Sequence, residues 1–374
     1  MMRILLISRS FNKHGGISRY VAELAERFVK EHETHLLTTK YDYKVENLIV
    51  HKKPIIEKPF WLQILSNAYY NTKYAKKLKE KFNIDVVHSN GAESLFCDVV
   101  TMHDCHRAWD EEYRSWGILQ VLRSTLDLTN RYVLYSERKL AEKSKKIITI
   151  SNNEKRRLLR FYDIPEEKIV VIPNGVNVEE FKFNVNERRK IRSRLRIEDN
   201  EVVLMFAGHE FRKKGLEIII KALPMVKEDV KLLVIGGDNP VYYKKLASKI
   251  GVLNKIVFLG LVPDIKEYYA ASDIFVFPSL HEGFGLVITE AMSSGLPVIT
   301  TKLTGASELI IDGYNGILLN EVNSEELARK INLLIEDEKL RKQIGKNARK
   351  TAEKYTWDET AKKTLEVYEE VAKR

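Results

Sequence analysis

Short apolar segments rich in β-branched residues alternate along the chain with longer segments in which apolar residues recur every three or four positions. This alternation is typical of parallel sheets whose strands are buried on both faces by helices. A first series of strands is predicted at residues 3–8, 33–39, 85–89, 99–104, 146–151 and 168–173. A second series is predicted at residues 202–208, 231–236, 255–260, 273–278, 297–301 and 316–319.

The two series of strands are separated by the turn signal Pro173-Asn174-Gly175 and by the polar, charge-rich segment 184–196. We therefore expect an α/β fold of two doubly wound, Rossmann-like domains with a cleft between them, residues 1–175 and 176–355. Ligands bind such sheets beyond the carboxyl ends of the strands, so the loops at those ends are the first candidates for a site. One predicted helix, residues 17–28, has a clear apolar stripe formed by Ile17, Tyr20, Val21, Leu24, Ala25 and Phe28.

The composition agrees with two globular domains. A chain of 374 residues is longer than one ordinary core requires, and its content of 44% hydrophobic and 30% charged residues is typical of globular proteins. No apolar run approaches the roughly 20 residues that cross a bilayer, and the first one ends at Ser8, too early for a signal peptide. Cys97 and Cys105 are too few for a disulfide framework, and no His/Cys spacing fits zinc. We expect a cytoplasmic protein without a metal.

The net charge of +10 favours anionic partners. No nucleic-acid module signature is present and the basic residues are spread along the chain, so nucleic acid is not an expected partner. Residues 61–82 and 106–123 interleave aromatic side chains with cations, which suits a peripheral position on an anionic membrane surface, such as the inner face of the plasma membrane. Solvated lysines with core aromatics would give the same pattern.

Two loops of the first domain carry candidate site residues. Gly15 and Gly16 precede the helix 17–28, where small residues let backbone amides approach an anion, although a tight turn alone also explains them. His103 and Asp104 follow an apolar strand. A histidine there can donate a hydrogen bond or exchange a proton near neutral pH, or be satisfied within the fold. Asp104 either orients His103 or caps the next segment.

Three consecutive cations, Arg212, Lys213 and Lys214, stand in the second domain just before a predicted helix. Cations at a helix N-terminus oppose the helix dipole, which costs about a few tenths of a kcal/mol when no ligand is bound. A diphosphate would be favoured there by both the dipole and the side chains. These residues therefore predict a diphosphate site.

Residues 279–292 form the most specific segment, in which a strand is followed by a glycine-rich turn and a helix. The turn and the first helical position, whose amides would be available to phosphate, are formed by Gly283, Phe284, Gly285 and Leu286. Glu282 lies in the turn and Glu290 in the helix. Carboxylates accept hydrogen bonds from sugar hydroxyls, so these two are candidates to hold a hexose and a ribose. A capped helix with two solvated glutamates is the simpler alternative.

The pattern Glu282-x7-Glu290, continued by Ala291-Met292-x-x-Gly295-x-Pro297-Val298-Ile299, resembles the signature of the retaining nucleotide-sugar glycosyltransferases of family 4, which have the GT-B fold. The agreement covers nearly the whole chain and includes Gly15-Gly16, His103-Asp104, residues 148–152 and 171–176, Lys214-Gly215, residues 258–260, Gly305-x-x-Glu308 and Trp357. Residues 208–215 and 234–240 are most similar to bacterial lipopolysaccharide core glucosyltransferases.

The resemblance implies roles for the matching residues of the first domain and of the cation cluster. Gly16, next to Gly15, would cover the donor diphosphate, and His103 would reach the transferred sugar near the reacting carbon. Lys214 would bind the diphosphate. Because His209 stands where many members have arginine, Arg212 or Lys213 would supply the second cation.

The remaining matches imply contacts with the donor's sugar, ribose and base. Glu282 would hold hydroxyls of the donor sugar, Glu290 would hold the ribose, and the loop containing Val262 would lie against the base. The family's C-terminal helix, here about residues 356–374, would return to the first domain.

The expected reaction moves a hexose, with retained anomeric configuration, from a nucleotide sugar to a hydroxyl of a glycan or glycolipid, in cell-envelope or lipopolysaccharide biosynthesis. The resemblance favours UDP-glucose as the donor and GDP-mannose next, with no cofactor and no metal. A sugar-nucleotide epimerase of the same fold and a non-catalytic sugar-nucleotide sensor are the alternatives. A phosphorylase would need inorganic phosphate, and a pyridoxal-dependent one a Schiff-base lysine in a context that the sequence lacks.

Overall fold

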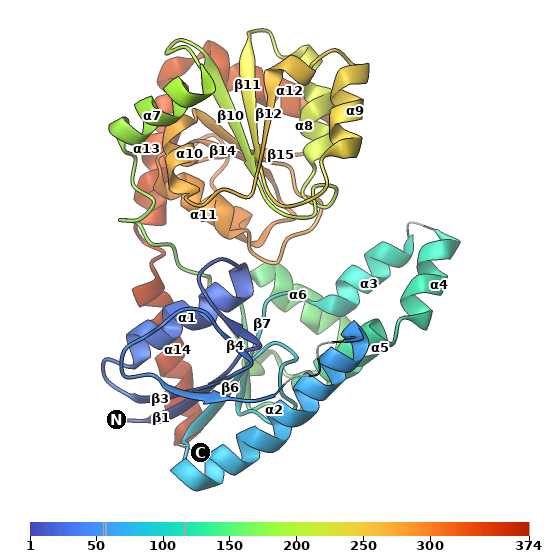
Figure 1. The fold of residues 1–374 in the computed structure, drawn as a ribbon, viewed down its shortest axis with the longest axis vertical. Coiled ribbons are helices and arrows are strands. Elements are labelled where there is room, and N and C mark those ends of the chain that lie inside the picture. Colours follow the sequence, from blue (N-terminus) through green and yellow to red (C-terminus); the bar gives the residue numbers. More distant parts are fainter. Residues whose placement is uncertain (55, 57, 116, 374) are drawn as a thin grey trace. The chain divides into compact units, whose positions relative to one another are not determined.

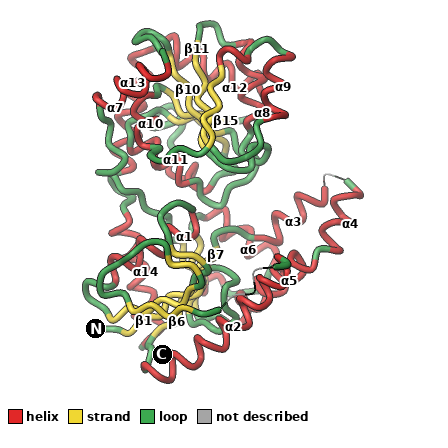
Figure 2. Tube along the Cα trace, in the orientation of Figure 1, coloured by secondary structure: helices red, strands yellow, loops and turns green. Residues whose placement is uncertain are grey.

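The computed structural model describes residues 1–54, 56, 58–115 and 117–373. The chain forms two compact units (Figure 1). The N-terminal unit consists of Met1–Asn174 together with Trp357–Arg374, and the C-terminal unit of Gly175–Thr356. Each unit has a parallel sheet with helices on both sides (Figure 2).

The sheet of the N-terminal unit has seven strands in the order β5-β3-β1-β6-β7-β8-β9. Their bounds are β1 Arg3–Ile7, β3 Glu33–Thr38, β5 Ile49–Lys52, β6 Val86–Asn90, β7 Val99–Met102, β8 Lys146–Thr149 and β9 Ile169–Val171. A separate pair joins β2 (Ser10–Phe11) to β4 (Lys40–Tyr41). Each strand of the first predicted series is present. The edge strand β5 was not predicted, because its half-exposed residues lack the continuous apolar run of a central strand.

Seven helices of the N-terminal unit are described: α1 Gly16–Phe28, α2 Phe60–Phe82, α3 His106–Ser115, α4 Ile118–Leu126, α5 Leu128–Lys143, α6 Asn152–Phe161 and α14 Trp357–Ala372. The predicted stripe of α1 is buried except for Ile17, which is 55% exposed. Among the described helices of the whole chain, none is both long enough and apolar enough to cross a membrane.

The C-terminal helix α14 packs on α1 within the N-terminal unit. Trp357 and Tyr368 are fully buried, and the Thr360 hydroxyl donates to the main-chain oxygen of Pro173 at 2.9 Å. The Tyr368 hydroxyl also hydrogen-bonds to Nδ1 of His88 on β6. Apolar burial and polar contacts together hold the end of the chain to this sheet.

The C-terminal unit has a six-stranded parallel sheet in the order β12-β11-β10-β13-β14-β15. The strands are β10 Val202–Ala207, β11 Val230–Ile235, β12 Ile256–Gly260, β13 Ile274–Phe277, β14 Val298–Thr301 and β15 Ile317–Leu319. The helices are α7 Val185–Leu195, α8 Leu216–Ala222, α9 Val241–Lys249, α10 Lys266–Ala271, α11 Leu286–Ser293, α12 Ser324–Glu336 and α13 Glu338–Ala352. Every strand of the second predicted series is present.

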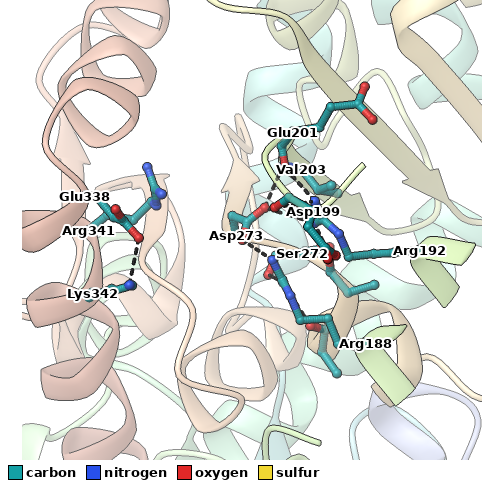
Figure 3. A network of polar contacts seen from close by, with 12 residues as sticks. Arg188, Arg192, Asp199, Glu201, Val203, Ser272, Asp273, Glu338, Arg341 and Lys342 are labelled. Atoms are coloured by element: carbon teal, nitrogen blue, oxygen red, sulfur yellow. Dashed lines mark hydrogen bonds and ion pairs between the residues drawn. The ribbon is translucent and has the colours of Figure 1, made fainter. Parts of the chain in front are cut away.

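The charge-rich segment 184–196 is the helix α7, although its polarity had suggested a break in the chain. Its N-cap is Asn184, whose side-chain oxygen accepts from the amides of Asn186 and Glu187 at 2.9 and 3.3 Å. Two of its arginines bind one carboxylate at the amino edge of the sheet: Arg188 lies 2.8 Å and Arg192 3.3 Å from Asp273 (Figure 3). The charges of α7 therefore fasten it to the C-terminal unit.

Candidate functional site

The loops that follow the strands of the C-terminal unit meet along the carboxyl edge of its sheet. Main-chain hydrogen bonds of 2.9 Å link them in pairs: Gly208 N to Ile235 O, Gly236 N to Gly260 O, and Leu280 N to Lys213 O. Adjacent strands thus bring together segments that lie far apart in the sequence. The candidate residues from three of these loops share one edge.

Two glycines permit this close packing of loops. Gly215 has φ +80°, and a Cβ added to it would lie 2.2 Å from the main-chain oxygen of Pro278. Gly236 has φ +153°, and its Cβ would lie 1.9 Å from the oxygen of Gly208. A side chain at either position would force the two backbones apart, so the loop spacing depends on glycine.

The structure distinguishes the three consecutive cations. Lys214 is buried, forms an ion pair with Glu282, and holds its ammonium 5.9 Å from the ring centre of Phe277. Arg212 is exposed and Lys213 partly exposed. The pKa of Glu217, at the start of α8, is lowered first by a hydrogen bond from Lys221 and in part by the charge of Arg212. Lys214 is therefore the cation of this cluster that lies beside Glu282.

The turn that contains Glu282 is fixed by the loop after β14. The amide of Gly305 donates to the oxygen of Glu282 at 3.2 Å, and the amide of Ala306 donates to the oxygen of Phe284 at 2.8 Å. Phe284 is itself buried. Helix α11 begins at Leu286, directly after Gly285, so its first two amides have no partner inside the helix, whereas the amide of Ile288 donates to the oxygen of Gly285 at 2.9 Å.

Glu290 lies on α11 and is only 6% exposed. The hydroxyl of Tyr269, on α10, donates to its Oε2 atom at 3.0 Å and also reaches the oxygen of Val287 at 3.3 Å. Tyr269 was not among the residues singled out from the sequence, because an aromatic residue on a short helix carries no motif. Only the packing of α10 shows that it orients the Glu290 carboxylate.

The loop after β12 lies beside the loops after β10 and β11. A Cβ on Gly237 would be 3.3 Å from Leu261 and 3.4 Å from the ring of His209. Leu261 is 71% exposed and the neighbouring Val262 is partly exposed. Leu261 and Val262 thus place two apolar side chains at this end of the carboxyl edge of the sheet, where a ligand could contact them.

The glycine loop of the N-terminal unit is organised by Asn12. Its side-chain oxygen accepts from the amide of His14 at 3.0 Å and from the hydroxyl of Ser18 at 2.9 Å. Helix α1 begins at Gly16, and Gly15 precedes it without a side-chain cap. Both glycines are exposed, so their main chains are accessible to a ligand.

His103 lies just after β7, with its Nε2 atom 2.5 Å from the side-chain oxygen of Asn90. The ring of Tyr20 packs against it edge to face, with centres 4.9 Å apart. Burial lowers the pKa of His103 to about 4, against the opposing charge of Asp104. The imidazole is therefore neutral near pH 7, which favours hydrogen bonding over the proton exchange that the sequence also allowed.

A cavity of about 970 Å³ lies at the opposite, amino edge of the C-terminal sheet. Arg188 and Asp273 line one side, and Glu338 pairs with Lys342 at 2.7 Å on the other (Figure 3). Among the described residues that line it, none was singled out as a site residue from the sequence. The pair of Arg188 and Asp273 holds α7 to the sheet, whereas Glu338 and Lys342 pair along α13 itself.

Comparison with known proteins matches both units to glycosyltransferase families. The model described as Glycosyltransferase Family 4 matches residues 14–180, and that of Glycosyl transferases group 1 matches residues 187–351. An uncharacterised glycosyltransferase of Methanocaldococcus jannaschii is 31% identical over 376 residues, which cover 95% of this chain and 94% of that protein. The chain belongs to the family-4 glycosyltransferases. Membership of glycosyltransferase family 4, expected from the Glu282-x7-Glu290 pattern, is thus confirmed.

Solved structures show that this glycosyltransferase has the GT-B fold. WaaG, a glycosyltransferase involved in lipopolysaccharide biosynthesis, superposes with a TM-score of 0.82 at 22% identity, covering 98% of this chain and 99% of WaaG. HepE of Anabaena, solved in complex with UDP-glucose, gives a TM-score of 0.75 at 22% identity, covering 98% of this chain and 100% of HepE. The predicted fold class, two Rossmann-like α/β domains, is confirmed.

Proposed function

We propose that this glycosyltransferase moves a hexose from a nucleotide sugar to a hydroxyl of a glycan or glycolipid, with retained configuration and without a metal ion. The observation that carries the proposal is the ion pair of Lys214 and Glu282. It sets a cation suited to a diphosphate beside a carboxylate suited to sugar hydroxyls. A nucleotide sugar joins these two chemical groups through one bond, so one such ligand could engage both side chains.

The donor contacts are proposed residue by residue. Lys214 binds the diphosphate, with Arg212 or Lys213 as the second cation. The amides of Gly283, Phe284, Gly285 and Leu286 face the phosphates. Glu282 holds the hexose, Glu290 the ribose and Val262 the base. Gly15 and Gly16 lie against the diphosphate and His103 against the transferred sugar.

UDP-glucose is the first candidate donor and GDP-mannose the second. The family resemblance favours this order. HepE, which is similar in fold, was solved in complex with UDP-glucose. The relationship of the fold to WaaG supports a role in cell-envelope or lipopolysaccharide biosynthesis. No cofactor is required by this chemistry.

The reaction depends on electrostatic stabilisation of the departing nucleoside diphosphate. Negative charge grows on the diphosphate as the sugar–phosphate bond breaks, so Lys214 and the turn amides act where that charge develops. Glu282 and Glu290 are not assigned as an acid–nucleophile pair, because Glu282 pairs with Lys214 and Glu290 accepts from the hydroxyl of Tyr269. The proton of the acceptor hydroxyl passes to the departing phosphate, and the neutral His103 orients the hexose by a hydrogen bond.

A panel of nucleotide sugars tests this proposal on the full chain. A donor at 100 times its dissociation constant should stabilise the protein by about 2.7 kcal/mol in thermal unfolding, and glycan acceptors should release the nucleoside diphosphate. Isomerisation of the sugar nucleotide without an acceptor would instead indicate an epimerase. Binding without nucleotide release, with every acceptor class supplied, would indicate a sensor.

We further propose that helix α4 brings the enzyme to an anionic membrane surface that carries the acceptor. Figure 1 shows α3 and α4 extending away from the sheet of the N-terminal unit. Five large apolar side chains on and next to α4 are at least half exposed: Ile118, Leu119, Leu122, Leu126 and Leu128. Apolar faces of soluble proteins are normally buried, so this surface favours an apolar partner.

The inward side of α4 is polar, which reverses the usual arrangement. Ser124 is buried and its hydroxyl donates to the carboxylate of Asp110, which also accepts from Asn130 at 2.9 Å. Arg107 and Arg114 lie 3.5 and 3.6 Å from the same carboxylate with partly exposed side chains. Polar anchoring thus leaves the apolar face of α4 exposed, and the two arginines lie on the polar side of the helix with Asp110.

Residues 61–82 and 106–123, in which aromatic side chains alternate with cations, differ in structure. In α2, Ile64, Ala68, Ala75 and Leu78 are buried and its lysines 73, 76 and 77 are exposed, as in an amphipathic helix on a core. Its exposed aromatic residues, Trp61 and Tyr69, are 40% and 63% exposed. The stretch 106–123 contains the exposed start of α4. Trp116, which contributed to the expectation, lies outside the described residues. The membrane proposal therefore rests on α4.

A further inference from the structure

Asn90 connects the two parts of the N-terminal unit that carry candidate site residues. It is the last residue of β6, which lies between β1 and β7 in the sheet. The chain after β1 leads to the glycine loop, and β7 ends one residue before His103. Asn90 is 4% exposed, with its amide nitrogen 3.3 Å from the main-chain oxygen of Ile17 and its oxygen 2.5 Å from Nε2 of His103.

These two contacts fix the orientation of the Asn90 amide. The oxygen of Ile17 can only accept a hydrogen bond, so the NH₂ group of Asn90 must face it. The opposite orientation would place two oxygens in contact. The side-chain oxygen therefore faces His103, where it too can only accept.

The orientation of Asn90 determines which nitrogen of His103 carries the proton. An acceptor at 2.5 Å from Nε2 requires a hydrogen on Nε2. A neutral imidazole has one proton, so Nδ1 is left with a lone pair. The groups around the ring are Tyr20, whose ring stands perpendicular to it, the charged Asp104, and the buried His88, whose pKa is lowered to about 3 by burial and by His103.

We propose that Asn90 is a positioning residue, which holds His103 as the Nε2-protonated tautomer so that Nδ1 accepts a hydrogen bond from a hydroxyl of the donor hexose. This inference rests on the proposed function, since it assigns His103 to the sugar. It adds a requirement on the substrate. A hexose with that hydroxyl replaced by hydrogen or fluorine cannot donate to Nδ1, so the site should discriminate against it.

The tautomer can be measured without any substrate. In the full chain labelled with ¹⁵N-histidine, the His103 signals at pH 7, assigned by their loss in His103→Gln, should show a protonated Nε2 and a bare Nδ1. Asn90→Leu should move both signals toward the average of the two tautomers. A protonated Nδ1 in the wild type, or unchanged signals in Asn90→Leu, would overturn the proposal, whatever the enzyme transfers.

A matched control separates positioning from general loss of a buried amide. Asn71 is also a buried asparagine of this unit, and its amide nitrogen donates to the main-chain oxygen of Glu93 at 2.7 Å. Asn71→Leu should lower stability while leaving the His103 signals in place. If Asn71→Leu moved these signals as far as Asn90→Leu, a specific role for Asn90 would be excluded. Asn90→Asp keeps the shape and should shift His103 toward imidazolium.

Deoxy donors link the tautomer to the reaction. With the natural donor, Asn90→Leu should lower kcat/KM by roughly 10-fold, the value of one lost hydrogen bond. For the wild type, one deoxy donor should have a kcat/KM lower than that of the natural donor by a similar factor. With that donor, Asn90→Leu should not lower kcat/KM further. Equal losses with every donor would overturn the role of Nδ1. Failure of all donors to react would contradict the proposed function while leaving the tautomer measurement valid.

Discussion

Lys214 and Glu282 form an ion pair across 68 residues of sequence. Lys214 stands at the end of the loop after β10, and Glu282 stands in the turn after β13, the strand next to β10 in the sheet. The same loops are joined by the hydrogen bond from Leu280 to the oxygen of Lys213. Each charge is therefore held near the carboxyl edge by backbone contacts, and each can exchange its partner for part of a ligand.

Removal of either charge should impair transfer severely. Lys214→Ala and Glu282→Ala are each expected to lower kcat/KM by roughly 10²-fold or more, because each removes a contact that strengthens as the diphosphate departs. Initial rates at varied donor concentration measure this effect. The matched control is Lys221→Ala, which removes an exposed lysine paired with Glu217 at 2.6 Å on α8 and should retain nearly normal rates.

The double variant gives a second measurement on the same pair. Because the two residues contact one another, the combined loss should be smaller than the product of the two single losses. Near-normal rates in both single variants would exclude the pair from the reaction. Losses that multiply fully would contradict a shared role.

The hydroxyl of Tyr269 should matter for donor affinity more than for turnover. Tyr269→Phe removes the hydrogen bond to Glu290 and frees this carboxylate from its fixed position. If Glu290 holds the ribose, KM for the donor should rise by several-fold, up to about 10-fold, with kcat little changed. Tyr268→Phe is the control, since the hydroxyl of that neighbouring residue is bound by Arg194 instead. A drop in kcat alone would argue against a ribose role.

The central strands and the Glu282-x7-Glu290 pattern could be recognised from local sequence. The contacts between the side chains of the site could not. Continuous apolar runs such as 202–207 predict buried strands directly, because both faces of the sheet are covered. Residues 184–196 misled because a surface helix with an Asn cap and paired arginines resembles a linker in composition. Tyr269 and Asn90 carry no motif, and their roles follow from the order of the strands and the packing of helices.

Stability of the N-terminal unit should fall as the pH falls below about 6.5. Burial lowers the pKa of His88 to about 3, whereas the unfolded chain binds this proton near pH 6.5. Between these values the unfolded state holds more protons, so stability decreases with falling pH by about 1.4 kcal/mol per pH unit for this residue. His103, with its pKa lowered to about 4, acts in the same direction.

Tryptophan fluorescence measures this effect in the full chain. All 4 tryptophans, Trp61, Trp109, Trp116 and Trp357, belong to the sequence of the N-terminal unit. Urea unfolding followed by this signal gives the free energy of unfolding at each pH. Between pH 6.5 and 4 this free energy should fall less steeply with falling pH in His88→Gln than in the wild type. Above pH 7.5 wild type and variant should have the same slope, since His88 is then neutral in both states. If wild type and His88→Gln lost stability equally steeply below pH 6.5, the role of His88 in this pH dependence would be refuted.

The outward face of α4 provides the last prediction. The double variant Leu122→Glu with Leu126→Glu replaces two leucines that are 52% and 75% exposed, so the fold should tolerate it. Binding to vesicles containing anionic lipid should drop by at least about 10-fold in sedimentation, because two apolar side chains are lost and two added carboxylates are repelled by the headgroups. Leu333→Glu, on an exposed leucine of α12, is the matched control and should bind like the wild type. Nucleotide-sugar binding should be unchanged in all variants, because these positions belong to no donor contact. If the α4 variant instead converts a dimer into a monomer without altering vesicle binding, the face is an interface between copies and the membrane proposal fails.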